Sequence, residues 1–308
     1  MSRAGGEPPP TEAEATEAEP PATRQRRVRA RVSPQALAAR RRDAREGLDW
    51  LGGPPEARAG LVYRLARLFA RALLFGAFRF HVTTSGQEEL PRGGYIVVVA
   101  THRGWIDPFV VLHALPLEPR AWFLGSAAST FTSRWREALI RRIGGLLPVW
   151  RGGVGIEQHL ASARAVLANG AVFVQMPEGT VSGPAGRIGP FRTGAGLIAL
   201  RTGATIVPLA IAGTEELYIG RRMASRVLPP VRPRDLVPGW DGVPPPAGSR
   251  EELDLARRIT EGLAAILGPV VEELQPATVD PPGRRRLLRR RLTWLFLAPG
   301  PLDRDLPA

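Results

Sequence analysis

The sequence contains no cysteine and no lysine, and only 4 histidines in 308 residues. Without cysteine, the chain has no disulfide framework, no thiolate metal site and no thiol nucleophile. With so few histidines, little material remains for a histidine-rich metal site. All 42 basic residues are arginines, against 29 acidic residues, which gives a formal net charge of +13. A surface of this charge favours anionic partners such as nucleic acid, phosphate head groups or an anionic membrane.

A long uninterrupted hydrophobic run is also absent. The most apolar stretch, residues 61–80, is interrupted by Arg64, Arg67, Arg71 and Arg79, whereas a transmembrane helix needs about 20 mostly apolar residues. The N-terminus is rich in Glu and Pro and does not show the basic and apolar order of a secretory signal. We therefore expect a peripheral protein at the cytoplasmic face of a membrane, with no transmembrane span.

Composition divides the chain into three parts. Residues 1–56 are predicted to be a disordered tail rich in Arg, Pro and Glu. Residues 57–275 are predicted to be the folded domain, which begins with an amphipathic helix over 57–80. That helix fits two interpretations, a membrane-interface helix or a packed helix with a charged outer face. Residues 276–308 form a basic amphipathic tail whose arginines, leucines and aromatic residues suit an anionic bilayer.

Within the domain, short apolar runs rich in Val, Ile and aromatic residues alternate with helical patterns. Continuous apolar runs are typical of strands that are covered on both faces. The predicted strands are 95–100, 121–124, 146–150, 171–175 and 205–211, and the predicted helices are 156–168, 194–201 and 250–274. This alternation predicts a three-layer α/β domain with a mostly parallel or mixed central sheet.

The first candidate site residues are His102 and Asp107, directly after the predicted strand that ends at Ala100. Five positions allow the chain to turn and present the carboxylate to the imidazole. The carboxylate would fix the histidine tautomer and stabilise the imidazolium, as a general base for a hydroxyl nucleophile requires. A surface or helix-capping pair is the simpler interpretation of these two residues alone.

A second polar turn, with Glu178, Gly179 and Thr180, follows the predicted strand 171–175. The glycine allows close backbone approach, the threonine offers a hydroxyl to a ligand oxygen, and the glutamate would orient either a glycerol hydroxyl or neighbouring arginines. Two polar turns at the carboxyl ends of apolar strands define the crevice where open α/β sheets bind ligands. Arg151 and Arg192 lie at two further candidate edges, where a guanidinium suits phosphate.

These residues together resemble the motifs of the glycerolipid acyltransferase family, typified by lysophosphatidic acid acyltransferase. His102 and Asp107 match its histidine-x4-aspartate motif, and the turn 177–182 matches Pro-Glu-Gly-Thr-x-Ser. Arg151 after an apolar run and the Ile-Val-Pro strand at 206–208 match the other two motifs more loosely, and the resemblance covers about residues 80–220. It implies a glycerol-3-phosphate acyltransferase-like fold and acyl transfer from an acyl-CoA or acyl-carrier protein thioester to a lysophospholipid hydroxyl in phospholipid biosynthesis, with lysophosphatidate as the favoured acceptor.

By this resemblance, His102 takes the hydroxyl proton and Asp107 orients His102. Glu178, Gly179 and Thr180 hold the acceptor, while Arg151 and Arg192 contact its phosphate; no metal or cofactor is implied. The sequence departs from the family at Thr101, Gly104 and Val181, which stand where asparagine, serine and arginine are usual. Arg103 and Arg187 are the nearest candidates to replace the lost cation.

Three alternatives follow from these departures and from the charge. The acceptor is a different lysolipid, the protein is a catalytically silent lipid-binding protein, or the arginine tails bind nucleic acid. Intact His102 and Asp107 argue against the silent protein, and the tails lack the folded recognition element of a specific nucleic-acid reader.

Overall fold

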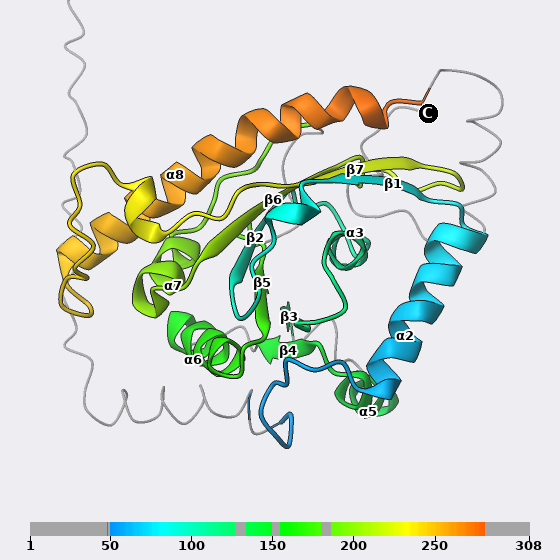
Figure 1. Ribbon diagram of the computed structural model, residues 1–308, viewed down its shortest axis with the longest axis horizontal. Coiled ribbons are helices and arrows are strands. Elements are labelled where there is room, and N and C mark those ends of the chain that lie inside the picture. The colour runs from blue at the N-terminus through cyan, green and yellow to red at the C-terminus, as the bar shows by residue number, and fades with distance from the viewer. Residues whose placement is uncertain (1–47, 49, 127–133, 150–154, 180–185, 281–308) are drawn as a thin grey trace, which may run out of the picture.

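The computed structural model describes residues 48, 50–126, 134–149, 155–179 and 186–280 (Figure 1). A seven-stranded sheet carries helices on both faces, which confirms the predicted three-layer α/β class. Of the predicted tails 1–56 and 276–308, residues 1–47, 49 and 281–308 lie outside the described residues, and so do Arg151, Thr180 and Val181.

The strands follow the order β1-β7-β6-β2-β5-β3-β4 across the sheet. Neighbouring strands are parallel except for β6 and β7, which are antiparallel. The central strands are continuous apolar runs buried along their whole length, as in the IVVVA sequence of β2, because helices cover both faces. The bounds are β1 His81–Ser85, β2 Ile96–Ala100, β3 Ala121–Ser126, β4 Leu146–Val149, β5 Val172–Gln175, β6 Ile206–Ala212 and β7 Arg222–Val227.

An apolar core lies on each face of the sheet, between the strands and the helices that cover them. One face of the sheet packs against α6, α7 and α8, and the other packs against α3 and the segment formed by α2 and η1 (Figure 1). The α-helices are α2 Leu61–Arg71, α3 Asp107–Ala114, α5 Arg134–Ile143, α6 Gly155–Ala168, α7 Gly194–Thr202 and α8 Arg250–Leu274. The π-helix η1 is Ala72–Ala77, and the 3-10 helices are η2 Gln87–Glu89, η3 Pro233–Leu236 and η4 Gln275–Thr278.

The predicted amphipathic helix is present as α2, but its orientation differs from that of an ordinary packed helix. Leu61, Leu65, Leu68 and Phe69 are 57–70% exposed. In contrast, Arg64 forms an ion pair of 2.6 Å with Glu118, and Arg67 donates to carbonyl groups at the end of α3. The apolar stripe of α2 therefore faces outward, while two of its arginines are held by the domain.

Arg120 at the start of β3 anchors α2 to the sheet. Its guanidinium lies 4.3 Å from the ring centroid of Tyr63 on α2 and 4.6 Å from that of Trp122. It also donates a 2.6 Å hydrogen bond to the carbonyl of Ile143, the last residue of α5. The side chain is buried, so one cation joins α2, β3 and α5.

Contacts with the domain extend beyond the predicted limits at residues 57 and 275. The indole of Trp50 donates to Glu137 on α5 at 2.6 Å, and the carbonyl of Glu56 accepts from Trp122 at 2.9 Å. At the other end, the hydroxyl of Tyr218 donates to Asp280 at 2.7 Å. Among the helices that the structure describes, none has the length and apolar character needed to cross a bilayer.

Candidate active site

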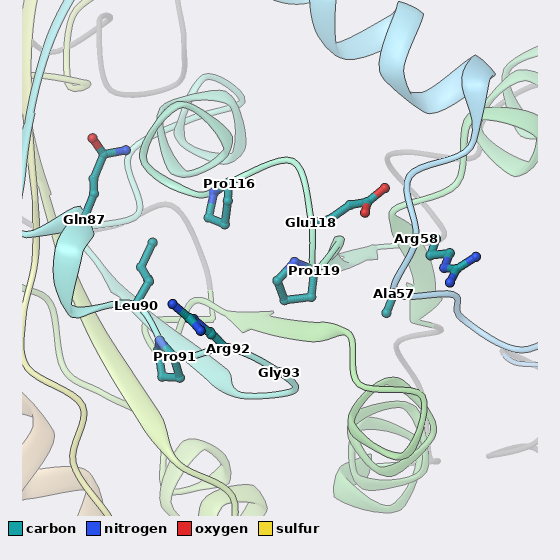
Figure 2. Close-up of a pocket in the computed structure, with 10 residues that line it drawn as sticks. All are labelled: Ala57, Arg58, Gln87, Leu90, Pro91, Arg92, Gly93, Pro116, Glu118 and Pro119. Atoms are coloured by element: carbon teal, nitrogen blue, oxygen red, sulfur yellow. The ribbon is translucent and has the colours of Figure 1, made fainter.

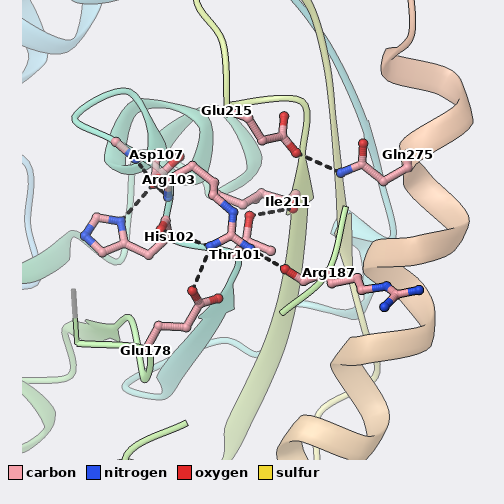
Figure 3. Close-up of polar contacts among 10 residues, drawn as sticks. Thr101, His102, Arg103, Asp107, Glu178, Arg187, Ile211, Glu215 and Gln275 are labelled. Carbon is pink, nitrogen blue, oxygen red and sulfur yellow. Dashed lines mark hydrogen bonds and ion pairs between the residues drawn. The ribbon is translucent and has the colours of Figure 1, made fainter. Parts of the chain in front are cut away.

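The pair of His102 and Asp107 forms at the carboxyl end of β2, where the chain turns into α3. Asp107 is the first residue of α3 and is completely buried. One of its oxygens, Oδ2, accepts from Nδ1 of His102 at 2.8 Å and from the backbone N–H groups of Arg103 and Gly104 at 2.6 and 2.8 Å (Figure 3). The carboxylate of a surface pair would be exposed, whereas that of Asp107 is not. Helix α3 begins with a carboxylate in its first turn, which also suits the positive end of the helix dipole.

These contacts define the chemistry of the imidazole. Since Nδ1 faces a carboxylate, the neutral ring carries its proton there, and Nε2 is the basic nitrogen. The side chain of His102 is 22% exposed, and the residue lines a large cavity. A histidine held this way can accept a proton from a hydroxyl, and the buried carboxylate stabilises the resulting imidazolium.

Glu178 follows β5, the neighbour of β2, and it meets the turn that carries His102. Its Oε2 lies 3.0 Å from Nη1 of Arg103, and both side chains are completely inaccessible to solvent (Figure 3). Burial raises the pKa of Glu178, while Arg103 and the N–H groups of Gly189 and His102 act in the opposite direction. Of the two roles considered for Glu178, the structure shows the one in which it orients an arginine.

The ion pair also changes the interpretation of Arg103. Its guanidinium donates to the carbonyl of Arg187 as well as to Glu178, so it joins three loops beneath the site. Because the guanidinium of Arg103 is buried and bonded within the protein, this arrangement argues against Arg103 as a replacement for the arginine that is usual at position 181. The side chain of Arg187 is 75% exposed and lies 3.9 Å from Glu272 on α8.

Gly179 and Arg192 lie together at the cavity. Gly179 has a φ of +70°, and a Cβ added there would lie 2.5 Å from Nε of Arg192. The backbone N–H of Arg192 donates to the carbonyl of Pro177 at 2.8 Å, which holds the two loops in contact. Of the predicted site residues within the described ranges, the structure therefore brings together His102, Asp107, Glu178, Gly179 and Arg192.

The cavity itself could not be predicted from the sequence. Its volume is about 1400 Å³, and His102, Gly179 and Arg192 line it together with apolar side chains of α2, η1, α3, α5, β3 and β4. Such side chains include Phe69, Leu73, Phe75, Phe109, Phe123 and Leu146. A smaller pocket of about 580 Å³ between the segments 87–93 and 116–119 contains none of the predicted site residues (Figure 2).

Two further histidines, which the motifs did not reveal, also line the cavity. Burial lowers the pKa of His159 on α6. Burial and the charges of Arg71 and Arg67 lower the pKa of His113 on α3. No group of His, Asp and Glu residues in the described part of the chain is arranged to hold a metal ion.

A family model for acyltransferases matches residues 81–212, which include β1 to β6 and the pair of His102 and Asp107. This match confirms the resemblance that the four motifs indicated. Among solved structures, the chain is similar to the 1-acyl-sn-glycerophosphate (LPA) acyltransferase PlsC from Thermotoga maritima. The two are 24% identical, the similarity covers 71% of this chain and 81% of that chain, and the TM-score is 0.48.

Proposed function

We propose that this protein transfers a fatty acyl group from an acyl-CoA or acyl-carrier protein thioester to a hydroxyl of a lysophospholipid, with lysophosphatidate as the favoured acceptor. The main observation in support is the buried carboxylate–imidazole pair of Asp107 and His102 beside a cavity whose lining is mostly apolar. The pair supplies a general base, and the cavity suits a fatty acyl chain.

In the proposed reaction, Nε2 of His102 takes the proton of the acceptor hydroxyl while the hydroxyl oxygen attacks the thioester carbonyl. The tetrahedral intermediate then collapses, the C–S bond breaks, and the departing thiolate takes the proton back from His102. Asp107 stays ionised and stabilises the imidazolium between these two steps. The exposed guanidinium of Arg192 binds the acceptor phosphate beside Gly179, and by family resemblance Arg151 and Thr180 join it.

We also propose that the reaction takes place at a membrane surface. The outward apolar stripe of α2, with four side chains 57–70% exposed, would sit in the interface of an anionic membrane. Phe69 and Leu73 are exposed and also line the cavity, so the same segment contacts both the proposed membrane and the proposed acyl chain. The protein would thus act as a peripheral enzyme at the cytoplasmic face.

Thioester consumption by the purified protein tests the chemistry. We expect turnover with lysophosphatidate and a 10²- to 10⁴-fold lower rate for His102→Ala, since a general base contributes about that factor. His81→Ala is the matched control, because His81 is exposed on β1 and does not line the cavity. If the protein acylates only another lysolipid, the reaction stands and that lysolipid replaces lysophosphatidate as the acceptor. No turnover with any acceptor, while lipid binding persists, would instead identify a lipid-binding protein.

A further inference from the structure

Helix α5 exposes apolar and basic side chains on the same surface. Trp135 and Leu139, one turn apart, are 66% and 47% exposed. Four of the ten residues of α5 are arginines, and all four are exposed. The inner side of the helix contributes Ile140 and Ile143 to the cavity that His102 also lines. Helix α5 therefore separates the cavity from a surface that combines an aromatic residue, a leucine and cations.

The fully exposed charged side chains of α5 are all arginines, and its one acidic residue is only partly exposed. Glu137 is half-buried and accepts a 2.6 Å hydrogen bond from the indole of Trp50. The guanidinium of Arg136 lies 5.5 Å from the ring centroid of Trp135, so the aromatic side chain and a cation occupy the same part of the surface. An exposed tryptophan and leucine among arginines are typical of a helix that lies in a membrane interface.

Helices α2 and α5 are in contact, and Figure 1 shows α5 at the lower end of α2. The outward stripe of α2 and the exposed side chains of α5 account for seven of the large apolar side chains exposed in the described part of the chain: Leu61, Val62, Leu65, Leu68, Phe69, Trp135 and Leu139. The concentration of these side chains on two adjacent helices favours one extended partner over separate small contacts.

We propose that α5 is a second membrane-contacting element, in addition to α2. Trp135 and Leu139 enter the interface of an anionic bilayer, and the arginines of α5 pair with lipid phosphates. The occupant is a bilayer because apolar insertion and cationic charge extend over both helices. The inference rests on the proposed function at a membrane surface, and it adds the specific surface and the lipid charge that this surface requires.

Co-sedimentation of the full chain with vesicles tests this proposal. One vesicle preparation contains equal parts of phosphatidylglycerol and phosphatidylcholine, and the other contains phosphatidylcholine alone. We expect the double variant Trp135→Ser/Leu139→Ser to partition at least about tenfold more weakly to the anionic vesicles, since two exposed apolar groups are lost. We expect Arg142→Gln to partition about fivefold more weakly. Leu253→Ser is the matched control, because Leu253 is 51% exposed on α8, on the opposite side of the sheet.

The outcomes separate α5 from the rest of the proposal. The double variant should retain its rate with detergent-dispersed lysophosphatidate, because neither residue lines the cavity. If it binds vesicles like the wild type while Leu65→Ser/Leu68→Ser on α2 does not, the inference about α5 is wrong and the membrane function stands. Wild type that binds neither vesicle would overturn both. Unchanged vesicle binding with a loss of rate confined to acyl-carrier protein as donor would assign α5 to an acidic protein and overturn the bilayer proposal.

Discussion

Replacement of Arg103 by methionine distinguishes a buried structural cation from a phosphate ligand. The substitution keeps an unbranched apolar stem but leaves the carboxyl of Glu178 without its cation, in a site where both side chains are fully buried. Removing one partner of a buried ion pair costs about 3–5 kcal/mol, a large part of the 5–15 kcal/mol that stabilises a typical domain. With about 2 kcal/mol per M in urea, the unfolding midpoint should fall by about 2 M.

Two further variants isolate the cause. In Arg103→Met/Glu178→Gln no uncompensated charge remains, so the urea midpoint should recover most of its loss. We expect a low acyl-transfer rate in both Arg103→Met and the double variant, because the hydrogen bond from Arg103 to the carbonyl of Arg187 is missing in each. Arg187→Met is the matched control, since that exposed side chain makes only a 3.9 Å contact, and exposed pairs contribute little.

The pH dependence of unfolding gives a second measurement of the same change. Burial raises the pKa of Glu178 and Arg103 opposes that shift, so the pKa in Arg103→Met should rise further. A carboxyl with a raised native pKa contributes stability below its ordinary pKa of 4.5 and loses it as the pH rises through the native pKa. The variant should therefore lose stability more steeply than the wild type as the pH rises above about 4.5.

Arg103 is not a structural cation if Arg103→Met unfolds at the same urea concentration as the wild type and only the KM for the acceptor rises. That result would return Arg103 to the role of a phosphate ligand. Failure of the double variant to recover would show that the charge of Glu178 is not the source of the loss.

The remaining predictions concern the cavity rim and the anchor of α2. Gly179→Ala should raise the KM for a phosphate-bearing acceptor several-fold, because the added Cβ displaces the guanidinium of Arg192. Gly203→Ala is the matched control. Gly203 has a similar positive φ but open space around it, so this substitution should lower the stability and leave the KM unchanged. An equal KM in both variants would contradict the assignment of Arg192. Arg120→Met should lower the free energy of unfolding by about 2 kcal/mol through lost cation–π contacts and a lost hydrogen bond. Urea unfolding with the exposed Arg58→Met as control measures this, and equal midpoints would show that the anchor is dispensable.

The sequence allowed the buried strands to be predicted to within about two residues, because β2, β5 and β6 are continuous apolar runs. It did not reveal β1 and β7, whose sequences HVTTS and RMASRV mix polar and apolar residues. Helix α3 was also missed, since it starts at Asp-Pro and is apolar on most sides, so it has almost no amphipathic pattern. Helix α5 was missed because arginines take up much of a short segment.

For the candidate site, local spacing predicted the contact of His102 with Asp107. The partner of Glu178 was not predictable in the same way, because Arg103 lies 75 residues earlier in the chain and meets it only through the adjacency of β2 and β5. The cavity depends on packing between α2, α3 and α5, which no motif records. The proposed chemistry comes from the resemblance to the acyltransferase family, and the structure shows the neighbours of those site residues that it describes.

Helix α3 is held at both ends by charge. Asp107 occupies its first turn, and the guanidinium of Arg67 from α2 donates to the carbonyl groups of Leu112, Leu115 and Pro116 at its last turn. Eight residues at 1.5 Å each make a rigid spacer of about 12 Å between α2 and the turn that carries His102. If α2 rests in a bilayer as proposed, this spacer sets the separation between the lipid-facing helix and the proposed general base, His102. Lengthening or shortening α3 by one turn would change that separation by about 5 Å without altering any residue of the proposed site.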